Sequence, residues 1–198
     1  MWNMCFRNTK TTCASSLLLA VLLVASLAGA QEAPVNEVLV TAAATSRLLV
    51  NDSFEQWEGD TPTGWEVSIP KAVAKAAEGE KGKVVASVTP QEKDPVDIRQ
   101  LLKPDLFLPG DTLLLIVECY ADNAGAAEAV IRQNAGEGGK RVVNTESHPG
   151  GGWAMLPVMV ALQDPPPASI EFRLRVAPGN DAPVRVRSIR AEVVPAIP

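Results

Sequence analysis

The chain has 198 residues, with 18 lysines and arginines against 23 aspartates and glutamates, so its formal net charge is −5. A mildly acidic chain with scattered charges gives no reason to expect nucleic-acid binding. Its 16 prolines, the first at Pro34, are too many for a helical domain of this size and favour many turns.

The first 30 residues are typical of a secretory signal peptide. Arg7 and Lys10 form a short basic region, an apolar run covers residues 15–27, and Ala28-Gly29-Ala30 places small residues before a cleavage site. The apolar core is shorter than the roughly 20 residues that a spanning helix needs. We therefore expect cleavage before Gln31 and a secreted or periplasmic protein with no transmembrane segment; the alternative is an uncleaved membrane anchor.

Removing the signal would leave 168 residues with a net charge of −7, because it carries two basic and no acidic residues. Residues 31–46 are predicted to be a leader or linker. From residue 47 to residue 198, β-prone segments alternate with turns rich in Gly and Pro, which indicates one all-β sandwich domain. The expected strands are residues 48–50, 65–69, 71–77 (with helix as the alternative), 84–88, 96–100, 112–120, 127–133, 141–143, 153–161, 170–176 and 184–194.

Two of these segments carry the strongest patterns. Residues 112–120 are nearly continuously apolar, which predicts a central strand. Residues 170–176 alternate strictly, with Ile170, Phe172, Leu174 and Val176 on one face. Cys119 lies in the first segment and is the one cysteine left after cleavage, so no intramolecular disulfide can form. We expect a small buried thiol, the alternative being an exposed one for dimerisation or catalysis.

Several short sequence motifs occur in the same order along the chain as the motifs of a known protein family. They are Leu49–Glu55 with Pro62–Trp65, Gly82–Pro90, Ile98–Gln100 with Leu108–Asp111 and Leu114–Ala121, and Gly152-Trp153 with Ile170–Val176 and Val184–Val194. From about residue 47 to 195 the chain resembles the jelly-roll carbohydrate-binding modules with a galactose-binding-like fold. This resemblance implies a two-sheet antiparallel jelly-roll β-sandwich without catalytic activity.

The same family often holds a structural calcium ion, using the glutamate of its first motif and one of two aspartates in its last strand. Glu55 matches the glutamate, but Arg187 and Ser188 stand where the aspartates are expected. Calcium needs a shell of oxygen ligands, so an arginine at this place argues against the ion. We expect no cofactor, with structural calcium as the alternative.

No constellation of residues predicts an enzyme. His148 is the only histidine, and beside Ser147 in a Gly/Pro loop we expect it to be solvated, with no carboxylate to orient it as a base. Residues 136–140 end in Gly-Lys but lack the P-loop spacing and the following Ser or Thr, so we expect a hairpin turn. The 23 acidic residues offer many carboxylate pairs, and none is singled out for glycosidase chemistry.

Sugar-binding modules stack aromatic rings on pyranose rings and add charged or amide groups for the hydroxyls. We expect Trp65 and Trp153 to be core rings, since each begins a strand after glycine, and Phe54 and Phe172 to be core by alternation. The ligand-binding candidates are Glu118 and Tyr120, which project together, with Arg132, Arg173 and Arg175 on the same face and Trp57 at the rim. The alternative is an ordinary polar sheet face held by ion pairs.

The sequence therefore predicts a secreted, non-catalytic module that binds carbohydrate or another envelope polymer. The alternative is a structural or assembly protein of the cell envelope, which uses the same sandwich for protein contacts and binds no glycan. Aromatic exposure separates the two. Two or more exposed rings on one face favour a glycan, whereas an apolar patch without a groove favours a protein.

Overall fold

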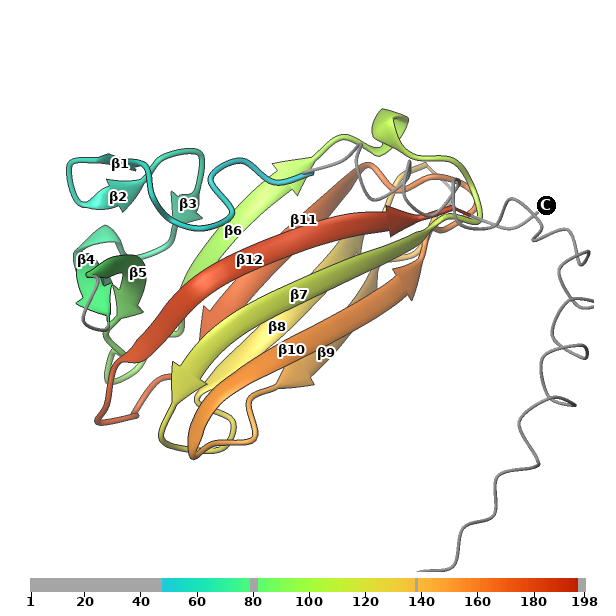
Figure 1. Ribbon diagram of the computed structural model, residues 1–198. Coiled ribbons are helices and arrows are strands. Elements are labelled where there is room, and N and C mark those ends of the chain that lie inside the picture. Colours follow the sequence, from blue (N-terminus) through green and yellow to red (C-terminus); the bar gives the residue numbers. More distant parts are fainter. Residues whose placement is uncertain (1–47, 79–81, 138, 196–198) are drawn as a thin grey trace, which may run out of the picture. The chain divides into compact units, whose positions relative to one another are not determined.

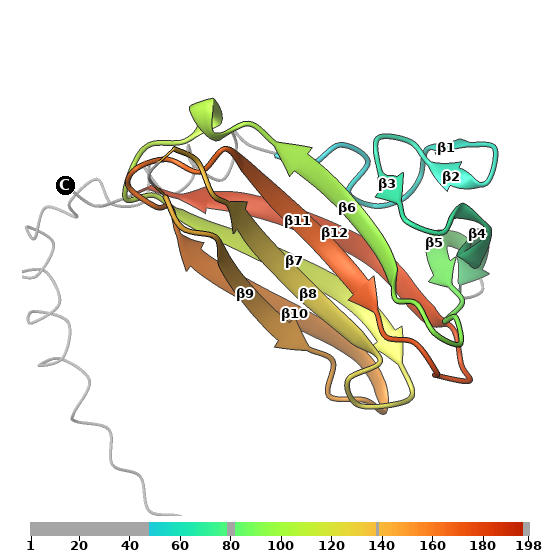
Figure 2. The same cartoon turned by 180° about the vertical axis from the view of Figure 1, so that it is seen from behind.

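Two five-stranded antiparallel sheets pack face to face in the computed structural model, which describes residues 48–78, 82–137 and 139–195. The predicted signal peptide and leader lie outside these residues. The all-β sandwich is confirmed, and its two sheets are seen from opposite sides in Figure 1 and Figure 2. In the described part of the chain, no helix is long and apolar enough to cross a membrane.

The sheet that faces the reader in Figure 1 is called here the β7 sheet. Its order is β10 (Gly152–Ala161), β7 (Thr112–Ala121), β12 (Val184–Val194), β5 (Lys83–Val88) and β4 (Val73–Glu78).

The second sheet, called the β11 sheet, faces the reader in Figure 2. Its order is β3 (Glu66–Val67), β6 (Val96–Leu102), β11 (Ser169–Val176), β8 (Ala127–Asn134) and β9 (Val142–Ser147). A small ribbon of β1 (Trp57–Glu58) and β2 (Thr61–Pro62) precedes β3, and the 3-10 turns η1 (Pro70–Ala72) and η2 (Pro104–Leu106) complete the described elements.

The core lies between the sheets, where alternate residues of each strand point inward. Leu113, Leu115, Val117 and Cys119 of β7 are fully buried, as are the four apolar residues of β11 that the alternation assigns to the core. The buried position predicted for Cys119 is confirmed. Burial raises the pKa of the Cys119 thiol to about 12, so the side chain is a protonated apolar group at neutral pH.

The first described segment closes one end of the core through Asn51. This residue takes a positive φ of 51°, which asparagine tolerates better than most residues. Its side chain bonds the backbone of Gln56 in both directions and donates to the carbonyl of Thr63. Its own carbonyl accepts the indole N–H of Trp65 at 3.0 Å, and Trp65 stacks on the fully buried Phe54 with ring centroids 5.3 Å apart.

Leu48–Val50 is not a strand, although a short β-prone run was expected there. Its backbone is bound by a side chain instead: Gln100 Nε2 donates to the Val50 carbonyl at 2.7 Å, and Gln100 Oε1 accepts from the Val50 N–H at 3.1 Å. A buried amide with this geometry replaces a neighbouring strand, which a strand pattern alone does not reveal. Residues 73–78 are strand and not helix, and β9 extends beyond the predicted residues 141–143.

His148 is only 1% exposed, so the expectation of a solvated loop residue is wrong. Its Nδ1 accepts the N–H of Gly150 at 2.9 Å, so Nε2 carries the proton and donates to the Cys119 carbonyl at 3.2 Å. Both ring nitrogens therefore have backbone partners, so the buried imidazole has no unsatisfied polar atom. The ring fastens the loop after β9 to the end of β7.

Candidate functional site

The structure divides the six predicted ligand-binding residues between three places. Glu118 and Tyr120 lie on the outer face of the β7 sheet, whereas Arg132, Arg173 and Arg175 belong to β8 and β11 on the opposite side of the sandwich. The prediction that these five share one face is wrong. Alternation tells which side of a strand a residue occupies, but it does not tell which sheet the strand joins.

Trp57, the sixth candidate, belongs to the β1–β2 ribbon. Its indole N–H donates to the Phe54 carbonyl at 2.6 Å, and its ring packs against the edge of the core. The polar atom of this side chain therefore already has an internal partner.

Trp153 is the main correction to the predicted core. It is half-buried and does not belong to the buried core cluster, because on β10 the inward positions are Leu156, Val158 and Val160. Trp153 lies directly across from Tyr120 of β7, and their rings meet edge to face with centroids 5.8 Å apart. Cross-strand aromatic pairs in this arrangement stabilise a sheet and present two rings at its surface.

Two arginines from β12 cover these rings. The guanidinium carbon of Arg185 lies 4.2 Å from the Tyr120 ring centroid, and that of Arg187 lies 3.7 Å from the Trp153 centroid. Arg187 also pairs with Glu78 and Glu118, at 2.8 Å each, and these contacts raise its pKa. We call Tyr120, Trp153, Arg185, Arg187 and Glu118 the ring row.

Polar atoms remain available around the ring row. Tyr120 donates its hydroxyl hydrogen to Asp122 at 2.8 Å, which raises the pKa of the phenol. The indole N–H of Trp153 has no hydrogen-bond partner among the described residues, and no carboxylate of these residues lies within ion-pair distance of Arg185. The row thus combines two partly exposed rings with donors and an acceptor.

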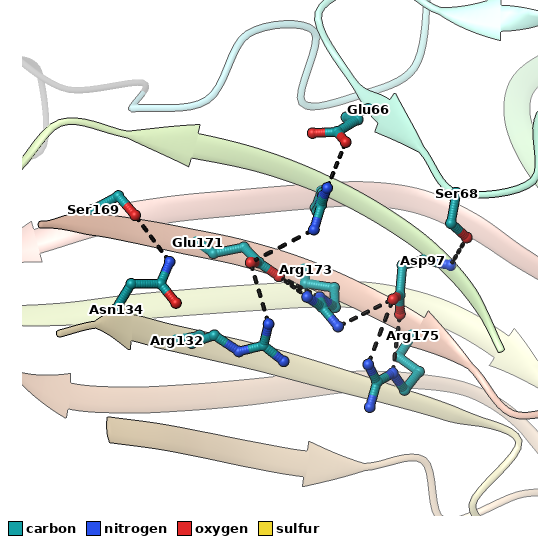
Figure 3. A network of polar contacts seen from close by, with 10 residues as sticks. Glu66, Ser68, Asp97, Arg132, Asn134, Ser169, Glu171, Arg173 and Arg175 are labelled. Atoms are coloured by element: carbon teal, nitrogen blue, oxygen red, sulfur yellow. Dashed lines mark hydrogen bonds and ion pairs between the residues drawn. The ribbon is translucent and has the colours of Figure 1, made fainter. Parts of the chain in front are cut away.

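The outer face of the β11 sheet is entirely different, as Figure 3 shows. Arginines and carboxylates from β3, β6, β8 and β11 form one connected network of ion pairs. Its members are Glu66, Asp97, Arg99, Arg132, Glu171, Arg173 and Arg175. We call this set the β11 network.

The centre of the β11 network is buried although it faces away from the core. Glu171 and Arg173 each expose only 3% of their side chains and are in direct contact. Arg173 also reaches Asp97 at 3.0 Å, and Asp97 accepts from Arg175 at 3.0 Å. The Asp97 contact raises the pKa of Arg175, and Glu66 does the same for Arg99. Most charges here satisfy one another.

No group of three or more His, Cys, Asp or Glu side chains in residues 48–78, 82–137 and 139–195 is arranged to hold a metal ion. Glu55 is exposed, and Arg187 points to the ring row from a β-bulge between Val186 and Ser188. Arg187 is engaged with Glu78, Glu118 and Trp153, and a guanidinium at this place does not fit a calcium shell.

The sequence identified Glu118 and Tyr120 but missed Trp153, Arg185 and Arg187 as their neighbours. The alternation of Val184 and Val186 with the two arginines was a usable signal for an outward direction. Which ring each arginine covers depends on the register of β12 against β7, where Arg185 lies across from Tyr120 and the bulge follows. That register is a tertiary property.

Family models and curated proteins yield no match to this chain. Among solved structures, the chain is similar to the CBM22-1 xylan-binding domain of Paenibacillus barcinonensis Xyn10C, with a TM-score of 0.53, 16% identity, and 74% of this chain and 94% of that one covered. A Stig cyclase from Fischerella sp. TAU gives a TM-score of 0.55 at 16% identity, covering 75% and 97%.

The enzymatically active domain of tailspike protein 4 from bacteriophage CBA120 gives a TM-score of 0.56 at 12% identity. The similarity covers 74% of this chain but only 21% of that one. Carbohydrate-binding modules of families 4, 16 and 61 are also similar, at 10% to 17% identity. At these identities the likeness establishes a fold, and that fold is used by binding modules and by enzymes alike.

Proposed function

We propose that this protein is a secreted, non-catalytic carbohydrate-binding module whose glycan lies along the ring row. The observation that carries the proposal is the pair of partly exposed rings, Tyr120 and Trp153, set side by side on two adjacent strands. Rigid strands hold both rings in place, so little ordering is needed when a ligand binds.

The chemistry of the ring row suits a sugar. An aromatic ring packs on the apolar face of a pyranose, while donors and acceptors around it bond the hydroxyls. The indole N–H of Trp153 and the guanidinium of Arg185 supply donors, and Asp122 supplies an acceptor. The similarity to carbohydrate-binding modules supports the same function, although it does not indicate which face binds.

Affinity electrophoresis through gels that contain a neutral polymer, xylan or β-1,4-galactan, tests this proposal. We expect at least one polymer to retard the wild type, and Tyr120→Ala and Trp153→Ala to abolish most of that retardation. Met159→Ala is the matched control, because Met159 lies on the same face of β10 and is 61% exposed but is six residues from Trp153. This control should bind like the wild type.

Two outcomes would contradict the proposal. If no polymer retards the wild type, the module does not bind these glycans and the assembly alternative moves ahead. If a polymer retards the wild type and Trp153→Ala equally, the ring row is not where that glycan binds. Circular dichroism of each variant ensures that lost binding is not lost folding.

A second candidate function, assembly through protein contacts, is favoured by an apolar strip on β10. Met155 is 65% exposed and Met159 is 61% exposed, and both lie on the outer face that carries Trp153. The free edge of β10 is closed to another strand. Pro157 lacks an N–H, and the carbonyls of Met159 and Ala161 accept side-chain amides from the other sheet at 2.7 Å each.

A protein partner would therefore have to lie on the face of β10, not along its edge. Sedimentation of the purified protein over a wide concentration range tests the simplest case, self-association. A concentration-dependent dimer that Met155→Lys and Met159→Lys abolish would support assembly. A monomer at all concentrations, together with glycan binding, would exclude self-association and leave carbohydrate binding as the one candidate function.

A further inference from the structure

We propose that the β11 sheet carries a second binding site, in which Arg132 engages the carboxylate of an acidic sugar. This site lies on the opposite face of the sandwich from the ring row, and it does not depend on the ring row binding a glycan. It is carried by the one arginine of the β11 network that the network leaves unsatisfied (Figure 3).

Among the described residues, Glu171 is the only carboxylate that pairs with Arg132, and the contact is long. Arg132 Nη1 lies 3.4 Å from Glu171 Oε2, and the same oxygen also faces Arg99 Nη1 at 3.9 Å. The other oxygen of Glu171 is in close contact with Arg173. The Glu171 carboxylate thus serves three guanidinium groups. Arg99 has a closer carboxylate in Glu66, and Arg175 has one in Asp97, which it shares with Arg173.

Apart from the contact with Glu171, the Arg132 guanidinium donates no hydrogen bond to the described residues. Its Nε is buried and has no hydrogen-bond partner among the described residues, although its side chain still exposes 17% of its surface. Burial lowers the pKa of Arg132, and repulsion from Arg173 adds to this more than Glu171 opposes it. Arg141 also lowers it. An anion that reaches the exposed part of the Arg132 guanidinium would offset the repulsion from Arg173 and Arg141, so its arrival would be favoured.

The charge of the surroundings points the same way. The β11 network holds four arginines against three carboxylates, with Arg141 close enough to influence Arg132. The whole chain, in contrast, has a net charge of −5 and would repel a polyanion in general. An acidic polymer that binds must therefore recognise a local group of cations.

The group beside Arg132 indicates a sugar acid more than a bare ion. Asn134 is the next outward residue on β8, and its Nδ2 donates to Ser169 Oγ at 2.8 Å. Its side-chain Oδ1 accepts no hydrogen bond from the described residues, so it can accept one from a hydroxyl. A guanidinium fork for a carboxylate with an amide acceptor beside it matches a uronic acid, which carries both groups.

The experiment compares two polymers with the same sugar backbone, polygalacturonate and its fully methyl-esterified form, in which a neutral methyl ester replaces each carboxylate. By calorimetry or affinity electrophoresis, we expect the wild type to bind the free acid and to bind the ester at least tenfold more weakly. Arg132→Gln should weaken binding to the acid by at least tenfold. Arg190→Gln is the matched control, since it removes an exposed arginine from β12 of the other sheet.

Several results would overturn the proposal. These are failure of the wild type to bind polygalacturonate, equal binding of the ester, or equal loss in Arg132→Gln and Arg190→Gln, which would indicate a general charge effect. Trp153→Ala should bind polygalacturonate like the wild type if the two sites are separate; loss there would assign the polymer to the ring row. Because Arg132 is poorly paired, the melting temperature of Arg132→Gln should not fall by more than a few degrees, so folding is preserved.

Discussion

Substitution of Trp65 tests the core assignment most severely. Trp65 is 5% exposed, stacks on Phe54 at 5.3 Å and donates to the Asn51 carbonyl at 3.0 Å. Truncating a buried aromatic ring to alanine costs about 3–5 kcal/mol through lost transfer energy and the cavity left behind. The stack and the hydrogen bond lie at the closed end of the sandwich, so little can collapse into the space.

Substitutions of Trp65 and Trp153 should lower the free energy of unfolding by different amounts. For Trp65→Ala we expect a loss of about 3–5 kcal/mol in the free energy of unfolding. For Trp153→Ala, which removes a half-buried ring with one edge-to-face contact and two cation–π contacts, we expect a loss of about 1–2 kcal/mol. Trp65→Phe should fall between them, because it keeps the stack and leaves the Asn51 carbonyl without its donor.

Urea unfolding followed by circular dichroism measures both losses, with binding assays run on the same samples. Equal losses in Trp65→Ala and Trp153→Ala would refute the assignment of one ring to the core and the other to the surface. So would a loss below about 1 kcal/mol for Trp65→Ala, which lies far under the range for a buried ring.

Three further predictions concern buried polar or titratable groups. Cys119 should not react with a thiol reagent at pH 8 until the protein unfolds, and rapid reaction of the native protein would contradict its burial. Because the folded protein raises the pKa of Cys119 to about 12, the free energy of unfolding should fall as the pH rises above about 8.5, where the cysteine of the unfolded chain ionises. Gln100→Ala should cost about 1–3 kcal/mol in urea unfolding, since both backbone groups of Val50 lose their partner, and an unchanged midpoint would show that water replaces the amide. Arg173→Met should cost up to about 3–5 kcal/mol, because the buried Glu171 loses its closest partner and keeps only Arg132 at 3.4 Å and Arg99 at 3.9 Å. A neutral or stabilising effect would mean that the β11 network is dispensable.

The sequence was sufficient for the fold because its patterns are local. The strict alternation of residues 170–176 and the apolar run of residues 112–120 each predicted a strand. The structure places β11 at the centre of its sheet and β7 inside the other sheet, between β10 and β12. The core position of Phe54 was predicted from alternation, and that of Trp65 from a strand that begins after glycine; both are buried. These features need only the immediate neighbours of each residue.

The candidate site could be predicted only in part, since it depends on contacts distant in sequence. Glu118 and Tyr120 project together by strand geometry, but their neighbours Trp153 and Arg187 come from strands that start 32 or more residues later. Trp153 was assigned to the core because it begins a strand after glycine, but this pattern is equally compatible with the outer face of the strand. His148 was placed in solvent because no sequence pattern indicates the two backbone groups that bind its ring.

The indole N–H signals of a two-dimensional NMR spectrum test the central claim, glycan binding at the ring row, most directly. In the described residues Trp57 and Trp65 donate to backbone carbonyls at 2.6 and 3.0 Å, whereas Trp153 has no such partner. On titration with oligosaccharides of whichever polymer binds, we predict that the Trp153 indole signal shifts progressively and that those of Trp57 and Trp65 stay in place. Saturable binding with an unmoved Trp153 signal would contradict the account.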